Sequence, residues 1–304
     1  MIPLEEIRRA RERLGDAVVR TPLVRFDDRI WLKLENLQPI GSFKLRGALS
    51  AIRAAAPSEL AGGVVTTSAG NMGQGVAWAA REAGVRARIV APDSAPRAKL
   101  DAIERLGAAV VKVPFATWIE VFRTREYPGM EGLFVHPFSD DAVMAGNGTI
   151  GLEILEDLPD VDEVLVPYGG GGLSCGIASA LRARAPECKV YACEVETAAP
   201  LAASLEAGEP VEIDYVPSFV DGIGAPTVFP EMFELARKLL EGSLVVGLDD
   251  VAAAIRLLVE RNRIVAEGAG ATPVAAALHR TGKIVCVVSG GNIDTATLGG
   301  ILQG

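Results

Sequence analysis

Hydrophobic and polar positions alternate along the chain in a regular order of strand-like and helix-like segments. The strand-like runs are short and rich in β-branched or apolar residues, and lie at 63–67, 87–91, 109–113, 133–135, 163–166, 189–193, 244–246 and 283–288. The helix-like segments carry apolar residues at helical spacing, and lie at 72–84, 95–106, 173–185, 230–240 and 249–262. Strands that alternate with helices form parallel sheets covered by helices. The pattern therefore predicts an α/β protein with two parallel sheets.

The composition is that of an ordinary globular protein, and the net charge argues against negatively charged partners. Hydrophobic residues make up 49% of the 304 residues, charged residues make up 23%, and the formal net charge is −9. Such a negative chain favours neither a nucleic-acid partner nor an anionic membrane. Residues 1–20 are charged and helix-like, and no run of about 18 apolar residues could cross a membrane. The four cysteines lack metal-site spacing, as expected of reduced thiols in a cytoplasmic enzyme.

The segment Ile40–Ala48 places Lys44 directly after a glycine-serine turn and before an Ala/Leu-rich, helix-like run. Most lysines are solvated surface residues, so this lysine alone would be weak evidence of a site. A helix N-terminus and the neighbouring Arg46 would both oppose a positive charge on Lys44, which favours a neutral amine. A lysine with a lowered pKa can act as a nucleophile and as a base.

A glycine loop, a polar loop and a strand-end hydroxyl accompany this lysine. Gly169–Gly172 follows a strand-like run and precedes a helix, so its backbone can approach an anion closely. The loop lacks the P-loop ending and the dinucleotide fingerprint, and alone it does not separate pyridoxal phosphate from a nucleotide. The loop Ser68–Gly75 and the strand-end Ser289 add hydroxyl, amide and backbone N–H groups. An amine, phosphate-binding N–H groups and a partner for the ring nitrogen are the parts of a pyridoxal phosphate site.

In the order and spacing of these motifs, the chain resembles the fold-type II pyridoxal-phosphate enzymes of the serine/threonine dehydratase and serine racemase group. The resemblance runs from Thr21 to Asn292. It implies a tryptophan synthase β-like fold, in which a small α/β domain at 51–142 is inserted into a large domain formed by 1–50 and 143–304. It also implies that the cofactor lies between the two domains and that the protein is a homodimer or homotetramer.

The resemblance assigns a role to each motif. Lys44 would be the Schiff-base lysine and the catalytic base. The residues expected to contact the cofactor are Phe43, Lys44, Asn71, Gly169, Gly170, Gly171, Gly172, Leu173, Gly222, Glu267 and Ser289. Those expected to bind the substrate are Ser68, Ala69, Gly70, Asn71 and Met72. Ser289 would pair with the pyridine nitrogen, and its neutral hydroxyl would leave the ring a weak electron sink, which suits β-elimination.

Departures from the family pattern refine the expected chemistry. Serine racemases carry a serine at the position of Ala69, and its absence opposes racemisation. Met72 replaces the usual histidine, so we expect a less polar pocket edge.

Glu194 aligns with a metal ligand of the racemase branch, but the second carboxylate falls on Pro200, and a single carboxylate is a poor cage for calcium or magnesium. We therefore expect no metal. His136 has no partner motif for a triad, which favours a structural role.

We therefore expect an ammonia-lyase that converts L-threonine or L-serine into a 2-oxo acid and ammonia. Arg46 is expected to be structural. Alternatives within the fold are a dehydratase of another 3-hydroxy amino acid (of the hydroxyaspartate or phenylserine type), a serine racemase and a β-replacement synthase. A non-enzymatic nucleotide-binding module is a further alternative, and such a protein would be colourless when purified.

Overall fold

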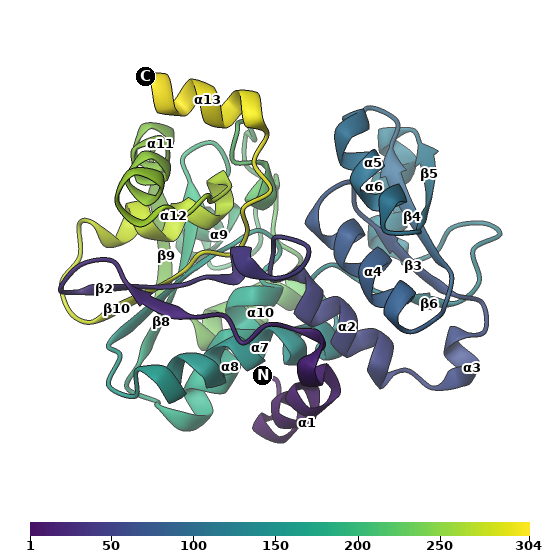
Figure 1. The fold of residues 1–304 in the computed structure, drawn as a ribbon, viewed down its shortest axis with the longest axis horizontal. Helices are drawn as coiled ribbons and strands as arrows, with labels where there is room; N and C mark the ends of the chain where they lie inside the picture. Colours follow the sequence, from purple (N-terminus) through teal and green to yellow (C-terminus); the bar gives the residue numbers. More distant parts are fainter.

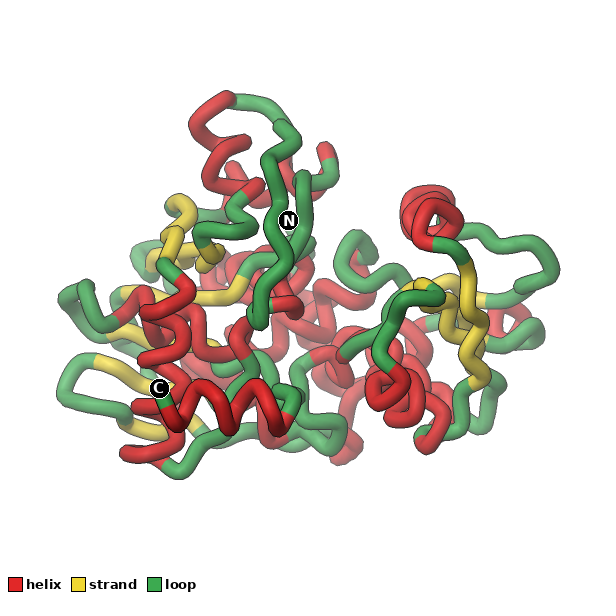
Figure 2. The backbone as a smooth tube through the Cα atoms, turned by 90° about the horizontal axis from the view of Figure 1, so that it is seen from above, coloured by secondary structure: helices red, strands yellow, loops and turns green.

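The structure is a computed structural model that describes residues 1–304. Two lobes lie side by side, each built around its own sheet (Figures 1 and 2). The large lobe contains a six-stranded sheet in the order β1-β2-β10-β7-β8-β9. Its strands are β1 (Leu23–Arg25), β2 (Ile30–Lys33), β7 (Glu163–Pro167), β8 (Lys189–Val195), β9 (Gly242–Val246) and β10 (Ile284–Val287). All neighbours are parallel except β1 and β2.

The small lobe contains a four-stranded, fully parallel sheet in the order β5-β4-β3-β6. Its strands are β3 (Val64–Thr67), β4 (Ala87–Pro92), β5 (Ala109–Val113) and β6 (Leu133–Phe134). The helices of this lobe are α3 (Pro57–Leu60), α4 (Asn71–Glu82), α5 (Arg97–Arg105) and α6 (Phe115–Thr124). The predicted α/β class with two parallel sheets is confirmed. The exact domain bounds stay a prediction, and the one between residues 50 and 51 falls inside a helix.

The large sheet is buried on both faces, because alternate residues of its central strands enter different apolar cores. In β10, Val285 and Val287 belong to one core and Ile284 and Cys286 to the other. The remaining α-helices are α1 (Leu4–Leu14), α2 (Lys44–Ala54), α7 (Asp141–Asp157), α8 (Gly172–Arg184), α9 (Pro200–Ala207), α10 (Pro230–Leu239), α11 (Leu248–Leu257), α12 (Gly268–Ala277) and α13 (Thr295–Gln303). None of the helices has the length and apolar character needed to cross a membrane.

The fold differs from the sequence pattern in several places. The strands β1 and β2 and helices such as α6, α9 and α13 were not among the predicted elements. The helix predicted at 249–262 is α11 followed by a π-helix, Leu258–Asn262. The long helix α7 was not among the predicted helices, because its residues from 143 to 154 are buried on every side and show no amphipathic pattern. Its glycines allow close helix packing: a Cβ on Gly146 would lie 2.5 Å from the Arg46 carbonyl oxygen.

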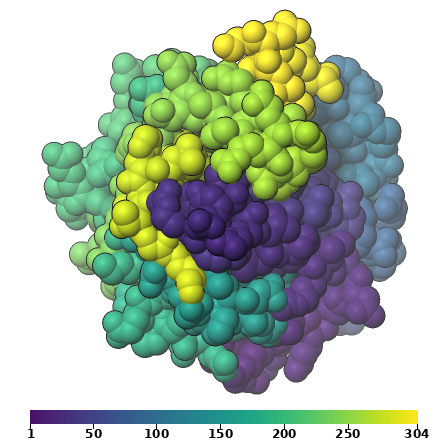
Figure 3. Space-filling view, turned by 60° about the vertical axis from the view of Figure 1, so that its left-hand side comes forward, coloured from purple at the N-terminus to yellow at the C-terminus, as the bar shows by residue number.

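The helix α2 lies between the lobes and packs against α7 on one side and α4 on the other (Figure 1). Distant parts of the chain also meet within the large lobe. The segment near the N-terminus lies beside the C-terminal part of the chain (Figure 3), since β2 pairs with β10 in the register Ile284 to Ile30. These two arrangements bring the lysine motif, the small-lobe loop and the last strand to one place.

Candidate active site

Lys44 is the first residue of α2 and lies at the junction of the lobes. Its Nζ donates a hydrogen bond of 2.9 Å to the carbonyl oxygen of Pro137, and it lies 5.1 Å from the centre of the Phe43 ring. The turn that precedes it depends on Gly41, which has a φ of +72°. A Cβ at Gly41 would also lie 2.6 Å from Asn292 Oδ1, so two constraints select glycine there.

Burial lowers the proton affinity of the Lys44 amine. Loss of hydration lowers the pKa of Lys44 to about 8, and the Glu267 carboxylate opposes this shift. The expectation that Arg46 lowers this pKa is wrong. The Arg46 side chain, only 1% exposed, is ion-paired with Glu35 at 2.8 Å and with Glu153 at 2.6 Å, so its charge is compensated locally.

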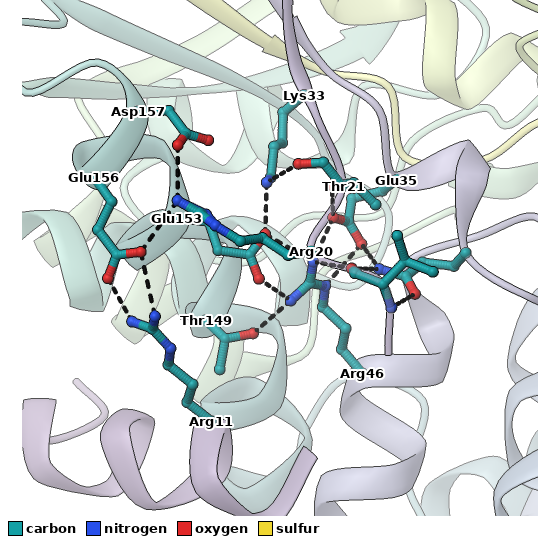
Figure 4. A network of polar contacts seen from close by, with 12 residues as sticks. Arg11, Arg20, Thr21, Lys33, Glu35, Arg46, Thr149, Glu153, Glu156 and Asp157 are labelled. Atoms are coloured by element: carbon teal, nitrogen blue, oxygen red, sulfur yellow. Dashed lines mark hydrogen bonds and ion pairs between the residues drawn. The ribbon is translucent and has the colours of Figure 1, made fainter. Parts of the chain in front are cut away.

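A buried ionic network surrounds Arg46 (Figure 4). Lys33 Nζ contacts Glu153 at 2.5 Å, and Arg46 also donates to the Thr149 hydroxyl at 3.1 Å. Two cations thus face two carboxylates, and the network joins β2, α2 and α7. This arrangement supports the structural role expected for Arg46, because a balanced network fixes the beginning of the helix that carries Lys44.

The glycine loop Gly169–Gly172 connects β7 to α8 and has the features of an anion cradle. Gly171 has a φ of +88°, and any side chain on Gly170 would collide with the Phe138 ring. The first bond of the helix runs from Cys175 N to Gly171 O at 2.9 Å, so the N–H groups before it have no acceptor within the helix. Such a helix start binds phosphate well, so the loop fits the phosphate group of the cofactor.

Ser289 follows β10 and lies beside the lysine motif. Its carbonyl oxygen accepts a 2.9 Å hydrogen bond from Phe43 N, and Ser42 forms an antiparallel bridge with Gly290. Ser289 is 2% exposed, and the buried hydroxyl of Ser42 has no partner. Two hydroxyl-bearing side chains therefore lie next to the segment that carries Lys44, which fits a hydroxyl partner for the pyridine nitrogen.

The small-lobe loop from Ser68 to Gly70 connects β3 to α4. Gly70 N donates to the Ser68 hydroxyl at 3.1 Å, and Asn71, the first residue of α4, extends to the large lobe. Asn71 Nδ2 donates to Glu267 Oε1 at 2.8 Å. Ala69, between the two polar residues, contributes no hydrogen-bonding side chain.

Met72 requires a correction. Its side chain is 2% exposed and belongs to the same buried cluster as Leu49 and Val76. It therefore does not make the pocket edge less polar, and only its backbone in the first turn of α4 remains available to a substrate. The helical spacing of Met72 and Val76 is the sequence feature that indicates this burial.

Glu267 is a buried carboxylate at the start of α12. It is 9% exposed, and burial together with the Asp221 carboxylate raises its pKa to about 7. Two glycines lie close to this carboxylate. A Cβ added to Gly290 would lie 2.5 Å from Glu267 Oε1, and a Cβ added to Gly222 would lie 3.6 Å from the same atom. The sequence therefore indicated correctly that Glu267, Gly222 and Asn71 lie together, while their contacts to the cofactor stay a prediction.

Glu194 is held entirely by protein donors. Its two carboxylate oxygens accept hydrogen bonds from Leu201 N and Ala202 N, both at 2.8 Å, and from the Ser243 hydroxyl at 2.6 Å. The carboxylate thus caps the N-terminus of α9, which begins at Pro200. The carboxylate that the family resemblance had matched to a metal ligand is here a helix cap.

His136 is buried in an aromatic cluster with Phe122, Phe138 and Phe229. Its Nδ1 accepts a 2.9 Å hydrogen bond from Ser139 N, and burial lowers its pKa to about 3. A neutral, packed imidazole fits the structural role expected from the sequence. The next residues, Pro137 and Phe138, contact Lys44 and the glycine loop, and no motif in the sequence had assigned them a role.

Comparison with known proteins agrees with this geometry. Residues 14–290 match the sequence model of the family described as pyridoxal-phosphate dependent enzyme. The chain belongs to this family. It is 41% identical to an L-threonine ammonia-lyase of Thermotoga maritima over 100% of this chain and 79% of the relative. The family predicted from the four motifs is therefore confirmed.

Two solved structures are similar over almost the whole chain. Maize serine racemase superposes with a TM-score of 0.92 at 30% identity, covering 99% of this chain and 97% of the racemase. The processed form of threonine deaminase isoform 2 from Solanum lycopersicum superposes with a TM-score of 0.87 at 31% identity, covering 98% of this chain and 93% of the deaminase. The fold is thus shared by both activities, and the residues of the site must separate them.

Proposed function

We propose that this protein is a pyridoxal-phosphate dependent L-threonine ammonia-lyase that also accepts L-serine. The observation that carries the proposal is the position of Lys44. Its amine, with a pKa of about 8, lies at the junction of the lobes, where the motifs for phosphate, ring nitrogen and substrate carboxylate meet. The named relatives support threonine as the substrate.

The residues that would bind the cofactor come from five segments of the chain. The N–H groups at Gly169–Leu173 would hold the phosphate, Ser289 would pair with the ring nitrogen, and Asn71 would contact the ring oxygen. Lys44 would hold the cofactor through its amine, and Phe43 and Gly222 would lie near the ring. Bound pyridoxal phosphate supplies an electron-withdrawing ring that stabilises negative charge at the substrate Cα.

The catalytic steps then follow from residues of this chain. Ser68, Gly70 and the backbone at Ala69 would hold the substrate carboxylate, which places Cα near Lys44. The neutral Lys44 amine would remove the Cα proton, and the β-hydroxyl would take up a proton as its bond to Cβ breaks and leave as water, so the substrate loses one proton and one hydroxyl group. Hydrolysis of the released enamine would consume one water molecule and give a 2-oxo acid and ammonia.

Ala69 favours elimination over racemisation. A racemase needs a second acid on the face of Cα opposite the lysine, and Ala69 has no proton to transfer. The structural likeness to maize serine racemase therefore supports the shared fold, while Ala69 supports the lyase activity.

The decisive test is turnover of L-threonine, measured as 2-oxo acid released by the purified protein. We expect Lys44→Ala to lower turnover by at least about 10³-fold and to abolish the visible absorbance of bound cofactor. The exposed Lys112 on β5 provides the control, since Lys112→Ala removes a lysine far from these motifs. Undiminished turnover by Lys44→Ala would overturn the proposal.

We further propose that the protein is a homodimer or homotetramer in the cytoplasm. The family resemblance supports an oligomer, and the four free cysteines fit a reducing compartment. Analytical ultracentrifugation of the protein at micromolar concentration would test the oligomer, since a monomer at all concentrations contradicts it.

A further inference from the structure

Asn292 joins three segments that carry the site. Its Nδ2 donates to Asn71 Oδ1 at 2.8 Å and to the Ile40 carbonyl oxygen at 2.9 Å. Its backbone N–H donates to Glu267 Oε2 at 3.2 Å. One residue therefore contacts the small-lobe loop, the segment that leads to Lys44, and the buried carboxylate.

These contacts fix the orientation of the Asn71 amide. Asn71 Nδ2 donates to Glu267 Oε1 at 2.8 Å, while its Oδ1 accepts from Asn292. If the amide were reversed, its NH₂ would face the NH₂ of Asn292, and its oxygen would face the carboxylate oxygen of Glu267. Both contacts would be repulsive, so Asn292 and Glu267 together select one orientation.

The contact between Asn71 and Asn292 crosses from the small lobe to the large lobe. Asn71 begins α4 directly after the loop from Ser68 to Gly70, so a fixed Asn71 also fixes the end of that loop. The Asn292 side chain packs closely against Gly41, because a Cβ added to Gly41 would lie only 2.6 Å from Asn292 Oδ1. Asn292 is nevertheless exposed at the surface, so burial does not explain these bonds.

We propose that Asn292 is a positioning residue, which docks Asn71 and the loop from Ser68 to Gly70 onto the large lobe in the orientation that binds cofactor and substrate. The inference rests on the proposed lyase function. Asn292 acts through Asn71, so its removal loosens the loop that would hold the substrate carboxylate while Lys44 keeps its own contacts.

The test compares Asn292→Ala with Asn36→Ala in the cofactor-loaded protein. Asn36 is a matched control, because its Nδ2 donates to the Val265 carbonyl oxygen at 3.1 Å on the same side of the large lobe without touching Asn71. We expect Asn292→Ala to raise the KM for L-threonine by about tenfold and to lower kcat by less than about threefold, because ground-state positioning is lost. Asn36→Ala should leave both constants near their original values.

A double-mutant cycle tests whether Asn292 acts through Asn71. In an Asn71→Ala background, Asn292→Ala should change KM by less than about twofold, because the partner amide is already absent. An equal effect of Asn292→Ala in both backgrounds would overturn the proposal, as would equal behaviour of Asn292→Ala and Asn36→Ala.

Amide hydrogen exchange gives a readout that needs no turnover. In the cofactor-loaded protein without substrate, Asn292→Ala should accelerate exchange at residues 68–73 by at least about tenfold, while Asn36→Ala should not. If the protein proved inactive on threonine, the proposed function would fail, and hydrogen exchange would still decide the role of Asn292. Unchanged exchange in Asn292→Ala would contradict the docking.

Discussion

Lys99 on α5 and Asp221 on the large lobe form an ion pair that bridges the two lobes beside Gly222. Both charges act on Glu267: the Asp221 carboxylate raises its pKa and the Lys99 ammonium lowers it. The proton affinity of the buried carboxylate therefore depends on a contact between the lobes. Lys44 on α2 is a further charged group that interacts with Glu267.

Lys99→Ala should raise the pKa of Glu267, which now lies at about 7. The shift should be smaller than about one pH unit, because the ion pair is exposed and screened by solvent. The pH dependence of kcat/KM reports the change, and Lys99→Arg, which keeps the charge, is the control. A downward shift of the profile in Lys99→Ala would contradict this electrostatic arrangement.

The rate of cofactor loading should rise with pH as Lys44 loses its proton. A lysine with an ordinary pKa near 10.5 would stay charged at neutral pH, whereas burial lowers the pKa of Lys44 to about 8. We expect the loading rate of the cofactor-free protein to increase between about pH 6 and about pH 9, with half of the maximal rate near pH 8, and to level off above that range. Stopped-flow absorbance measures this rate. A rate that kept rising in proportion to hydroxide up to about pH 10 would show an unshifted amine.

Ala69→Ser should introduce racemisation of L-serine. The new hydroxyl lies in the loop from Ser68 to Gly70, where it could return a proton to the face of Cα opposite Lys44. We expect D-serine formation to increase at least about tenfold relative to pyruvate formation, measured by chiral chromatography. Ala69→Gly is the control, since it changes size without adding a hydroxyl. Substantial D-serine from the unmodified protein would show that another group serves as the second acid.

Chelators should leave the activity nearly unchanged, because the Glu194 carboxylate already accepts hydrogen bonds from the N-terminus of α9. We expect less than about a twofold loss of threonine turnover on treatment with a strong chelator. Glu194→Ala should lower the free energy of unfolding by about 2–4 kcal/mol, since one buried and two partly buried donors lose their acceptor. Urea denaturation measures this change, with the exposed Glu187→Ala as control. A large loss of activity that magnesium or calcium restores would identify a metal site elsewhere.

Local sequence pattern accounts for much of the fold and for part of the site. The β-branched runs indicated eight of the ten strands and missed β1 and β2, while the glycine-serine turn before Lys44 and the run Gly169–Gly172 indicated two motifs of the candidate site. These features are encoded within a few residues, so a single sequence reveals them.

Contacts between distant segments account for what the sequence did not reveal. The pairing of Arg46 with Glu153 spans α2 and α7, and no local pattern shows that the Arg46 charge is compensated. The bond between Asn71 and Asn292 joins residues 221 positions apart. The helix α7 has no polar face to mark it, because it is packed between other helices.

The pairing of β2 with β10 has a consequence for folding during synthesis. The four-stranded sheet is complete once residue 134 has emerged from the ribosome, whereas Ile30 of β2 pairs with Ile284 of β10. Until almost the whole chain is made, the apolar β2 has an open edge on the side that β10 will occupy. Open strand edges promote association with other chains, so nascent-chain chaperones should protect this segment during translation.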